Sequence, residues 1–449
     1  MQQTIHRFII LSMILSYSTN LYSQTFVHGV IPSNTSWTKA GSPYVITGDI
    51  FIPEGVRLTI MPGTIVHLTD SLESGKGYTD RVDLIVEGVL IAQGSASDSI
   101  IFTSHSQMLS KPSWGVIAIK GDSSIFSYCS ISKGWGGIWL IDQASLSFNI
   151  SNSDIFDCTE FGLLAGNSGF VNVNHCTVRQ ISNNLYGAIH LGTLHESVDF
   201  TGFDISNTKV IDNSGAGISL CPFAGPIRSY TMTNNIISNN RIGIQWQIIP
   251  LELTDSDVSD NDIGFEIGWI STSQSLLGSV HRCNITNKSW NVRMLSDQPL
   301  CPYFTDNRWG SSDKDTILQK IYDKLVTFTG SYVPFEPFSS SPFDITLTSV
   351  YLSHNAVAPT QLWMSAYPNP FNPATTIEFT LTSRMNLFVR IFNLIGQEVF
   401  ADTRTYDSGK HSLSWDGTTH ASGLYFCHIR AIDINGNTSS VSYKLMLLR

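Results

Sequence analysis

The chain contains one dense run of acidic residues whose spacing could hold a metal ion. Four aspartates lie within eight positions, at Asp255, Asp257, Asp260 and Asp262. Carboxylate oxygens at such short intervals are the ligands that Ca²⁺ prefers. The run departs from the EF-hand pattern, because Ser259 stands at the fifth position and an aspartate where that loop requires glycine. Calcium binding is therefore one hypothesis for this segment, and the other is that the aspartates are ordinary turn residues.

A second set of residues could bind an extended ligand if the chain repeats regularly enough to align them. Its members are Trp139, His190, Gln245, Glu266 and Arg293. Polar groups about 4.8 Å apart beside an aromatic ring suit a glycan chain. His190 and Glu266 would lie three coils apart, about 14 Å, which is too far for an acid and a base to share one proton. Unrelated solvated side chains are the alternative interpretation.

A repeat that would align these residues runs through the first two thirds of the chain. A glycine followed by an apolar residue recurs at intervals of 25, 25, 30, 26 and 21 residues, at Gly137, Gly162, Gly187, Gly217, Gly243 and Gly264. Five of these glycines end a short turn-rich segment: FDCTEFG, ISNNLYG, IDNSGAG, ISNNRIG and VSDNDIG. Asn and Asp suit such segments because they tolerate left-handed backbone in tight turns. Units of about 25 residues with two or three short strands predict the coils of a parallel β-helix. A β-sandwich would not produce this regular spacing.

Alternation of side chains along each strand assigns the two faces of the repeat. One set of residues is expected to point into the core: Ile138, Leu163, Ile189, Ile218, Ile244, Phe265 and Val292, with Leu140, Ala165, Leu191, Leu220, Trp246, Ile267 and Met294. The residues between them should form an outward column: Trp139, Leu164, His190, Ser219, Gln245, Glu266 and Arg293. The candidate ligand-binding residues all lie in that column.

Both ends of the solenoid need a cap, because a terminal coil would otherwise expose an unpaired strand edge. Residues 43–104 continue the repeat more loosely and predict the first coils with an N-terminal cap. Residues 306–325 break the repeat and predict one helix. Asp313 or Asp315 could cap that helix, and Ile317, Ile321, Tyr322 and Leu325 follow helical spacing.

The two ends of the chain differ in character from the repeat. Residues 1–23 predict a secretory signal peptide, with Arg7 before an apolar stretch of eight residues from Phe8 to Leu15. The solenoid is expected over 24–340, and a Ser/Pro/Thr-rich linker over 341–365. Residues 366–449 contain about seven short strands separated by turns, which predicts a small immunoglobulin-like β-sandwich. The fold class expected for the whole chain is all-β.

Composition narrows the class of protein. Lys and Arg number 26 against 36 Asp and Glu, and no basic block occurs, so nucleic acid is not an expected partner. Hydrophobic residues make up 42% of the chain and charged residues 14%, which argues against disorder. Cys129, Cys176 and Cys283 recur in matching positions and are expected to be small core residues. No CxxC or HxxxH spacing indicates zinc.

The solenoid resembles a known family in three segments: SPYVITGDIFIPEGVRLTIMPGTIV, the glycine-marked coils, and DNRWGSSD with IYDK. These are similar to right-handed parallel β-helix proteins of the pectin-lyase-like kind, exported by bacteria. That fold includes lyases, hydrolases, adhesins and tailspikes, so it does not decide an activity. Trp139 to Gln143 approaches the WiDH segment of pectate lyases but lacks its histidine, and nothing matches their RxPxxR segment. The paired Asp, His-Gly and Arg-x-Lys signatures of the hydrolases are also missing.

The last domain resembles the C-terminal sorting domain of type IX secretion substrates over its full length. The matching positions are Pro368, Asn369, Pro370, Phe371, Asn372, Pro373, Gly396, Trp415, Asp416, Gly417 and Lys444. The resemblance implies recognition by an outer-membrane translocon, removal of the domain by a sorting protease, and release or anchoring of the remainder at the cell surface. Cys427-His428 replaces the more usual aromatic–basic pair.

These observations together predict an exported, cell-surface or secreted β-helix protein with an adhesive, glycan-binding or structural role. The alternative is a polysaccharide lyase or glycoside hydrolase that acts on an extended polysaccharide. Apart from Ca²⁺ in the acidic run, no cofactor is expected. The expected partners are the type IX translocon, its sorting protease and an extracellular glycan, and the chain is expected to be a monomer.

Overall fold

The computed structural model describes residues 24–70, 77–105, 114–121, 123–141, 143–166, 168–182, 186–192, 202–221, 230–247, 250–268, 278–295, 301–327, 331–347, 363–381, 384–393, 397–407, 409–433 and 438–448. Three predicted features lie outside these ranges: the signal peptide, Asp142 of the segment that approaches the pectate-lyase pattern, and Gly396 of the sorting motif. The chain forms two compact units, Met1–Leu352 and Ser353–Arg449. No helix in the described part of the chain is long and apolar enough to cross a membrane.

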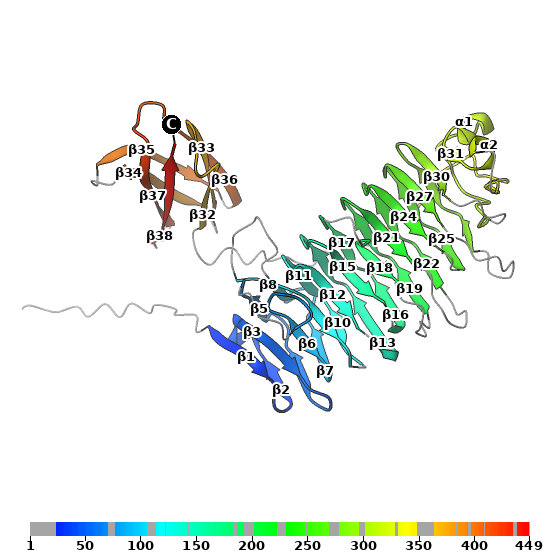
Figure 1. The fold of residues 1–449 in the computed structure, drawn as a ribbon, viewed down its shortest axis with the longest axis horizontal. Coiled ribbons are helices and arrows are strands. Elements are labelled where there is room, and N and C mark those ends of the chain that lie inside the picture. The colour runs from blue at the N-terminus through cyan, green and yellow to red at the C-terminus, as the bar shows by residue number, and fades with distance from the viewer. Residues whose placement is uncertain are drawn as a thin grey trace, which may run out of the picture. The chain divides into compact units, whose positions relative to one another are not determined.

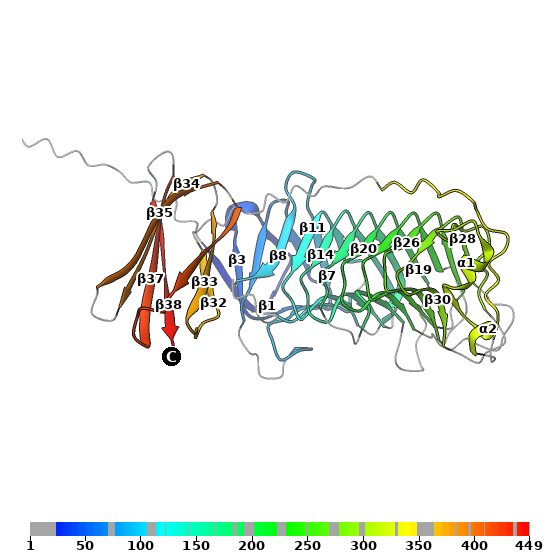
Figure 2. The same cartoon turned by 90° about the horizontal axis from the view of Figure 1, so that it is seen from above.

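The first unit is a parallel β-helix, whose coils stack along one axis in Figures 1 and 2. Each complete coil contributes one strand to each of three parallel faces, which we call the first, second and third face. Strands of the first face are β3 (Tyr44–Ile52), β6 (Leu84–Val86), β9 (Ile117–Ile119), β12 (Gly136–Leu140), β15 (Phe161–Ala165), β18 (Ile189–Leu191), β21 (Ala216–Leu220), β24 (Ile242–Trp246), β27 (Ile263–Ile267), β30 (Trp290–Met294) and β31 (Ile321–Tyr322).

The other two faces complete the coils. Strands of the second face are β1 (Thr25–Val30), β5 (Ile65–Leu68), β8 (Ile100–Ser104), β11 (Cys129–Ser132), β14 (Asp154–Phe156), β17 (Thr177–Arg179), β20 (Lys209–Ile211), β23 (Ile236–Ser238), β26 (Asp257–Ser259) and β29 (Asn284–Thr286). Strands of the third face are β2 (Thr35–Trp37), β4 (Arg57–Ile60), β7 (Val89–Gln93), β10 (Ile125–Ser127), β13 (Gln143–Ser151), β16 (Ser168–Asn174), β19 (Gly202–Ser206), β22 (Tyr230–Thr233), β25 (Leu251–Thr254) and β28 (Ser279–His281). The long strand β3 joins the first two faces, because Tyr44–Ile46 pair with β5 and Ile50–Ile52 pair with β6.

The core of the solenoid confirms the predicted inward residues. Ile138, Leu163 and Ile189 align on successive strands, and the register continues through the coils to Val292. All fourteen residues predicted to point inward are at most 5% exposed and belong to one apolar cluster. Burial of each large aliphatic side chain contributes about 1.5–3 kcal/mol, which makes this stack the main source of stability.

A ladder of buried asparagines closes the turns before the first face. The backbone N–H and the side-chain amide of Asn213 both donate to Oδ1 of Asn240, at 3.2 and 2.8 Å. Asn240 donates in the same way to Asn261, at 3.0 and 3.0 Å, and Asn261 to Asn287, at 3.1 and 2.9 Å. All four residues are at most 6% exposed. The ladder therefore satisfies backbone donors that the tight turns would otherwise leave unpaired.

The cysteines occupy a similar position at the start of the second face. Cys129, Cys176 and Cys283 are buried, as predicted, and all seven cysteines of the chain are free. The thiol of Cys129 donates to the backbone carbonyl of Ala92 on the preceding coil, at 3.3 Å. At the same place in another coil, Asn235 donates its amide to a carbonyl at 2.9 Å. These cysteines therefore close turns, besides filling space in the core.

The C-terminal cap differs from the single helix that the sequence predicts. Two short helices, α1 (Lys314–Leu318) and α2 (Lys324–Thr327), flank β31, which pairs with β30. Asp313 is the N-cap of α1 and accepts a hydrogen bond from the backbone N–H of Thr316 at 2.9 Å. The helical prediction from Ile317 to Leu325 was wrong because Ile321 adds a further rung to the first face, and strand pairing overrides local helical spacing.

Part of the expected linker contacts the solenoid. Phe343 exchanges two hydrogen bonds with the side chain of Asn284, at 2.9 and 3.0 Å. Its ring also lies 5.5 Å from the guanidinium of Arg282. Phe343 of the expected linker is therefore bound to Asn284 of the second face.

The second unit contains two antiparallel sheets with a shared apolar core, which is compatible with an immunoglobulin-like sandwich. One sheet has the order β32 (Trp363–Tyr367), β33 (Ala374–Leu381) and β36 (Gly409–Asp416). The other has the order β35 (Glu398–Tyr406), β34 (Met385–Asn393), β37 (Gly423–Asp433) and β38 (Thr438–Leu447). The number of strands matches the sequence prediction.

The sorting motif of this unit fastens its last strand. The Asn369 side chain donates to the backbone carbonyl of Lys444 at 2.7 Å and accepts from the backbone N–H of Met446 at 2.8 Å. Phe371 is 2% exposed, and its ring packs 5.2 Å from that of Trp415. The motif therefore has a clear folding role in this unit, whichever of its residues the secretion machinery contacts.

Candidate functional site: the outward surface of the first face

The structure aligns the predicted outward column on consecutive coils. Trp139 pairs with Leu164, Leu164 with His190, and the register continues through Ser219, Gln245, Glu266 and Arg293. The column divides into two parts with different chemistry. Its C-terminal half is a ladder of polar side chains, and its N-terminal half belongs to an aromatic cluster.

The polar half is bonded within itself. Ser219 donates to Gln245 at 3.2 Å, and Gln245 donates to Glu266 at 3.3 Å. Arg293 forms an ion pair with the other carboxylate oxygen of Glu266. Glu266 is only 5% exposed. The Glu266 carboxylate is therefore occupied by its neighbours, because residues on adjacent coils are close enough to satisfy one another's charges and hydrogen bonds.

His190 lies where the two halves of the column meet. It is 3% exposed, and burial lowers its pKa to about 4, so the ring is neutral near pH 7. Its Nδ1 atom has no hydrogen-bond partner among the described residues. The Tyr186 ring stands edge-on to the imidazole, with the ring centroids 5.3 Å apart. His190 is therefore held by packing and does not contact Glu266.

The aromatic half forms a cluster that we call the aromatic platform: Tyr78, Trp135, Trp139 and Tyr186 around Phe161. Phe161 is fully buried, whereas the other four rings are partly exposed. Trp135 and Tyr186 meet the Phe161 ring edge-on, with centroids 5.6 and 6.0 Å apart. Trp139 lies 6.4 Å from Phe161 and 5.7 Å from Tyr78. Edge-to-face packing of this kind fixes ring orientation and leaves faces or edges available for a ligand.

Two features below the platform hold its rings in place. Gly136 stands beside Phe161 in the register, and a Cβ atom there would lie 2.4 Å from the Phe161 ring. Asp83 is fully buried and accepts hydrogen bonds from the backbone N–H groups of Tyr78, at 2.7 Å, and Thr79, at 2.9 Å. Burial raises the pKa of the Asp83 carboxyl, and these bonds oppose the rise. The loop that carries Tyr78 is therefore anchored to the solenoid.

Sequence reasoning found only Trp139 of the platform. Phe161 and Tyr186 each directly precede a glycine of the repeat, and Trp135 lies one residue earlier in the register, because Gly136 pairs with Phe161. An aromatic residue just before the repeat glycine is the signal that could have revealed them. Tyr78 lies outside the repeat, and only the fold shows that it contacts Trp139.

The acidic run does not converge on one point. Asp255 and Asp260 occupy turns with left-handed backbone, at φ values of 47° and 58°. Asp255 forms an ion pair with Arg282 at 2.7 Å, and Asp262 lies 3.9 Å from the ammonium of Lys288. Burial raises the pKa of Asp257, which lies in β26. In the described part of the chain, no three His, Cys, Asp or Glu side chains are placed to hold a metal ion, so the structure gives the calcium hypothesis no support.

Comparisons with protein families agree with this architecture. Residues 29–134 match the family described as a pectate-lyase-like β-helix domain, and residues 86–195 match the right-handed β-helix region. Residues 365–446 match the secretion-system C-terminal sorting domain. The chain is thus a right-handed parallel β-helix followed by a sorting domain of the type IX secretion system. It is a secreted protein, exported to the cell surface or the extracellular space, and its sorting domain interacts with that machinery.

Solved structures provide distant similarities. The periplasmic alginate epimerase AlgG is 10% identical over 70% of this chain and 77% of its own, with a TM-score of 0.30. Tailspike protein 2 of an Escherichia coli O157:H7 bacteriophage is 11% identical over 89% of this chain and 64% of its own, with a TM-score of 0.32. No curated protein matches the chain.

Proposed function

We propose that the protein binds an extended glycan on the first face of its solenoid, as a secreted adhesive or scaffolding protein that does not cleave its ligand. The aromatic platform carries this proposal. Partly exposed rings of Tyr78, Trp139 and Tyr186 are fixed on a rigid sheet around a buried phenylalanine. Aromatic rings preorganised in this way stack on the apolar faces of sugars at little entropic cost.

The polar half of the column supports binding over catalysis. A general base or nucleophile needs a reactive atom within hydrogen-bond reach of the substrate. Glu266 is buried and paired with Arg293, and the side chain of His190 is also buried. The ladder therefore stiffens the face beside the platform. Cleavage by a lyase or hydrolase is the competing function, and the experiment below distinguishes it.

The test is a glycan-array screen of the purified chain, with release of unsaturated uronate and of reducing ends measured in the same samples. We expect binding without product. Trp139→Ala and Tyr186→Ala should each weaken binding about tenfold, since a stacked ring contributes roughly 0.5–1.5 kcal/mol beyond its buried area. Tyr303→Ala is the matched control, because Tyr303 is 51% exposed in the C-terminal cap, away from the platform. Product formation would favour a lyase or hydrolase. Neither binding nor product would favour a purely structural role.

The remaining features of the chain fit a processed surface protein. We propose that residues 1–23 are removed on export across the inner membrane and that the sorting domain, 366–449, is removed outside. We assign the solenoid to 24–340 and the linker to 341–365. The mature solenoid would act as a monomer, either released or anchored at the outer membrane. Mass spectrometry of the secreted protein would identify both new termini and test these boundaries.

A further inference from the structure

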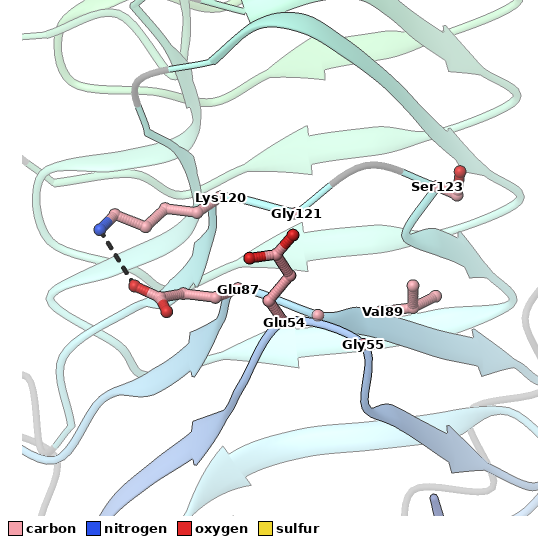
Figure 3. Close-up of a pocket in the computed structure, with 8 residues that line it drawn as sticks. Glu54, Gly55, Glu87, Val89, Lys120, Gly121 and Ser123 are labelled. Atoms are coloured by element: carbon pink, nitrogen blue, oxygen red, sulfur yellow. Dashed lines mark hydrogen bonds and ion pairs between the residues drawn. The ribbon is translucent and has the colours of Figure 1, made fainter.

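A hollow of about 510 Å³ lies at one end of the aromatic platform, where the first three coils turn away from the first face (Figure 3). Its lining comes from consecutive turns that stack on one another: Glu54, Gly55, Glu87, Gly88, Val89, Lys120, Gly121 and Ser123. Two of its glycines permit this close stacking. A Cβ atom on Gly88 would lie 2.2 Å from the carbonyl oxygen of Val56, and one on Gly121 would lie 2.0 Å from that of Gly88.

The hollow continues into the platform through Lys120. Its ammonium lies 3.2 Å from Oε1 of Glu87 and 5.7 Å from the centre of the Tyr78 ring. The Tyr78 ring in turn contacts Trp139. Hydrogen bonds to Tyr78 and Glu87 raise the pKa of the Lys120 ammonium. The only cation that lines the described hollow is therefore already shared between a carboxylate and an aromatic ring.

The two carboxylates give the hollow a net negative charge. Glu87 is paired with Lys120, while Glu54 has no ion pair or hydrogen bond with any described residue. Figure 3 shows their side chains on adjacent turns, with the Lys120 ammonium directed at Glu87. A ligand that reaches the hollow from the platform therefore meets acceptors and negative charge.

We propose that this hollow is the terminal subsite of the glycan surface and that it selects an uncharged sugar over a uronic acid. The proposal rests on the glycan-binding function proposed above. Hydroxyl groups of a neutral sugar would donate to Glu54 and Glu87, as charge-assisted hydrogen bonds. A uronate carboxylate would approach the unpaired Glu54 and find its possible partner, Lys120, already occupied. Two carboxylates about 6 Å apart near a protein surface repel enough to weaken binding roughly tenfold or more.

The test compares two probes of equal length on the full chain: neutral hexasaccharides of glucose or galactose, and hexagalacturonate. At 20 mM salt we expect the neutral sugar to bind at least tenfold more tightly. Because exposed charges are screened, the preference should shrink at 0.5 M salt. The double variant Glu54→Gln/Glu87→Gln should bring the two affinities within about threefold of each other. Glu252→Gln, which removes an exposed carboxylate on the third face, is the control and should leave the preference unchanged.

The outcomes separate this inference from the function on which it rests. If hexagalacturonate binds as tightly as the neutral sugar and Trp139→Ala weakens both, the platform binds glycans and the charge selection is wrong. If the double variant keeps the full preference, the hollow is not the subsite that discriminates. If neither probe binds, nor any other glycan, both proposals are overturned.

Discussion

The buried asparagine ladder yields a prediction whose size follows from four hydrogen bonds. The Asn240 side chain accepts two bonds from Asn213 and donates two, to the carbonyl of Val210 at 2.9 Å and to Oδ1 of Asn261 at 3.0 Å. Asn240→Asp keeps the size of the side chain and both accepted bonds. It replaces the donating amide with an oxygen that faces two acceptors.

The cost of this variant depends on pH. At pH 4 the buried carboxyl keeps its proton and donates to one acceptor, which leaves the other unsatisfied at a cost of about 2 kcal/mol. Burial and the facing acceptors should raise its pKa from about 4 to about 7. The folded state then retains a proton that the unfolded state releases, so stability falls as pH rises from 4 to 7. The added loss is about 4 kcal/mol, for a total near 6 kcal/mol at pH 8.

The assay is thermal unfolding of parent and variant, followed by circular dichroism at pH 4 and pH 8. For a solenoid of about 330 residues, these energies correspond to a Tm lowered by about 3 °C at pH 4 and about 9 °C at pH 8. Asn239→Asp is the matched control: Asn239 precedes Asn240, is exposed and has a φ of 55°. Aspartate occupies the equivalent turn position at Asp260, so this control should cost under about 0.5 kcal/mol. If Asn240→Asp and Asn239→Asp had the same Tm at pH 4 and again at pH 8, the asparagine ladder would not be a source of stability.

Three other predictions follow from burial. All seven thiols are buried, and burial raises the pKa of Cys176 and Cys283 to about 12. The native protein should therefore resist alkylation at pH 8, whereas the denatured chain should react. Fast labelling of the native protein would contradict this. The pKa of His190 in the folded state is lowered to about 4, so the unfolded chain binds a proton first as the pH falls. Between pH 7 and pH 4.5 the parent should therefore lose about 2.5 kcal/mol more stability than His190→Phe. Parallel plots of unfolding free energy against pH for the two proteins would contradict this. Phe371 is buried against Trp415, so Phe371→Ala should destabilise the sorting domain by about 3–5 kcal/mol. Secretion, measured by immunoblots of the culture medium, should fall as well. Normal secretion with unchanged stability would show that the packing of Phe371 on Trp415 is dispensable.

Features that repeat along the chain could be predicted from the sequence. Strand alternation and turn chemistry are local, so the inward positions from Ile138 to Met294 follow from the residues alone. The same reasoning predicted the left-handed turns that Asp255 and Asp260 adopt, as one of two alternatives. Trp139 could be placed on the outward surface for the same reason.

Contacts between coils could not be predicted, because they join residues that lie 21 or more positions apart and depend on the length of each coil. The ion pair with Arg293, for example, buries the Glu266 carboxylate, which strand alternation alone places on the outward surface. Pairing of Ile321 with Val292 likewise divided an expected helix into two short ones.

The sequence by itself therefore determined the repeat, the inward core and the sorting domain at its end, because each is encoded by local periodicity or by a contiguous motif. Only the tertiary structure decided which outward residues remain accessible. The rings of Trp135, Trp139 and Tyr186 pack around Phe161 to form one platform. A loop from outside the repeat adds Tyr78, which contacts Trp139. The physical reason is that accessibility depends on neighbouring side chains across coils, and the stacking of the coils sets those neighbours.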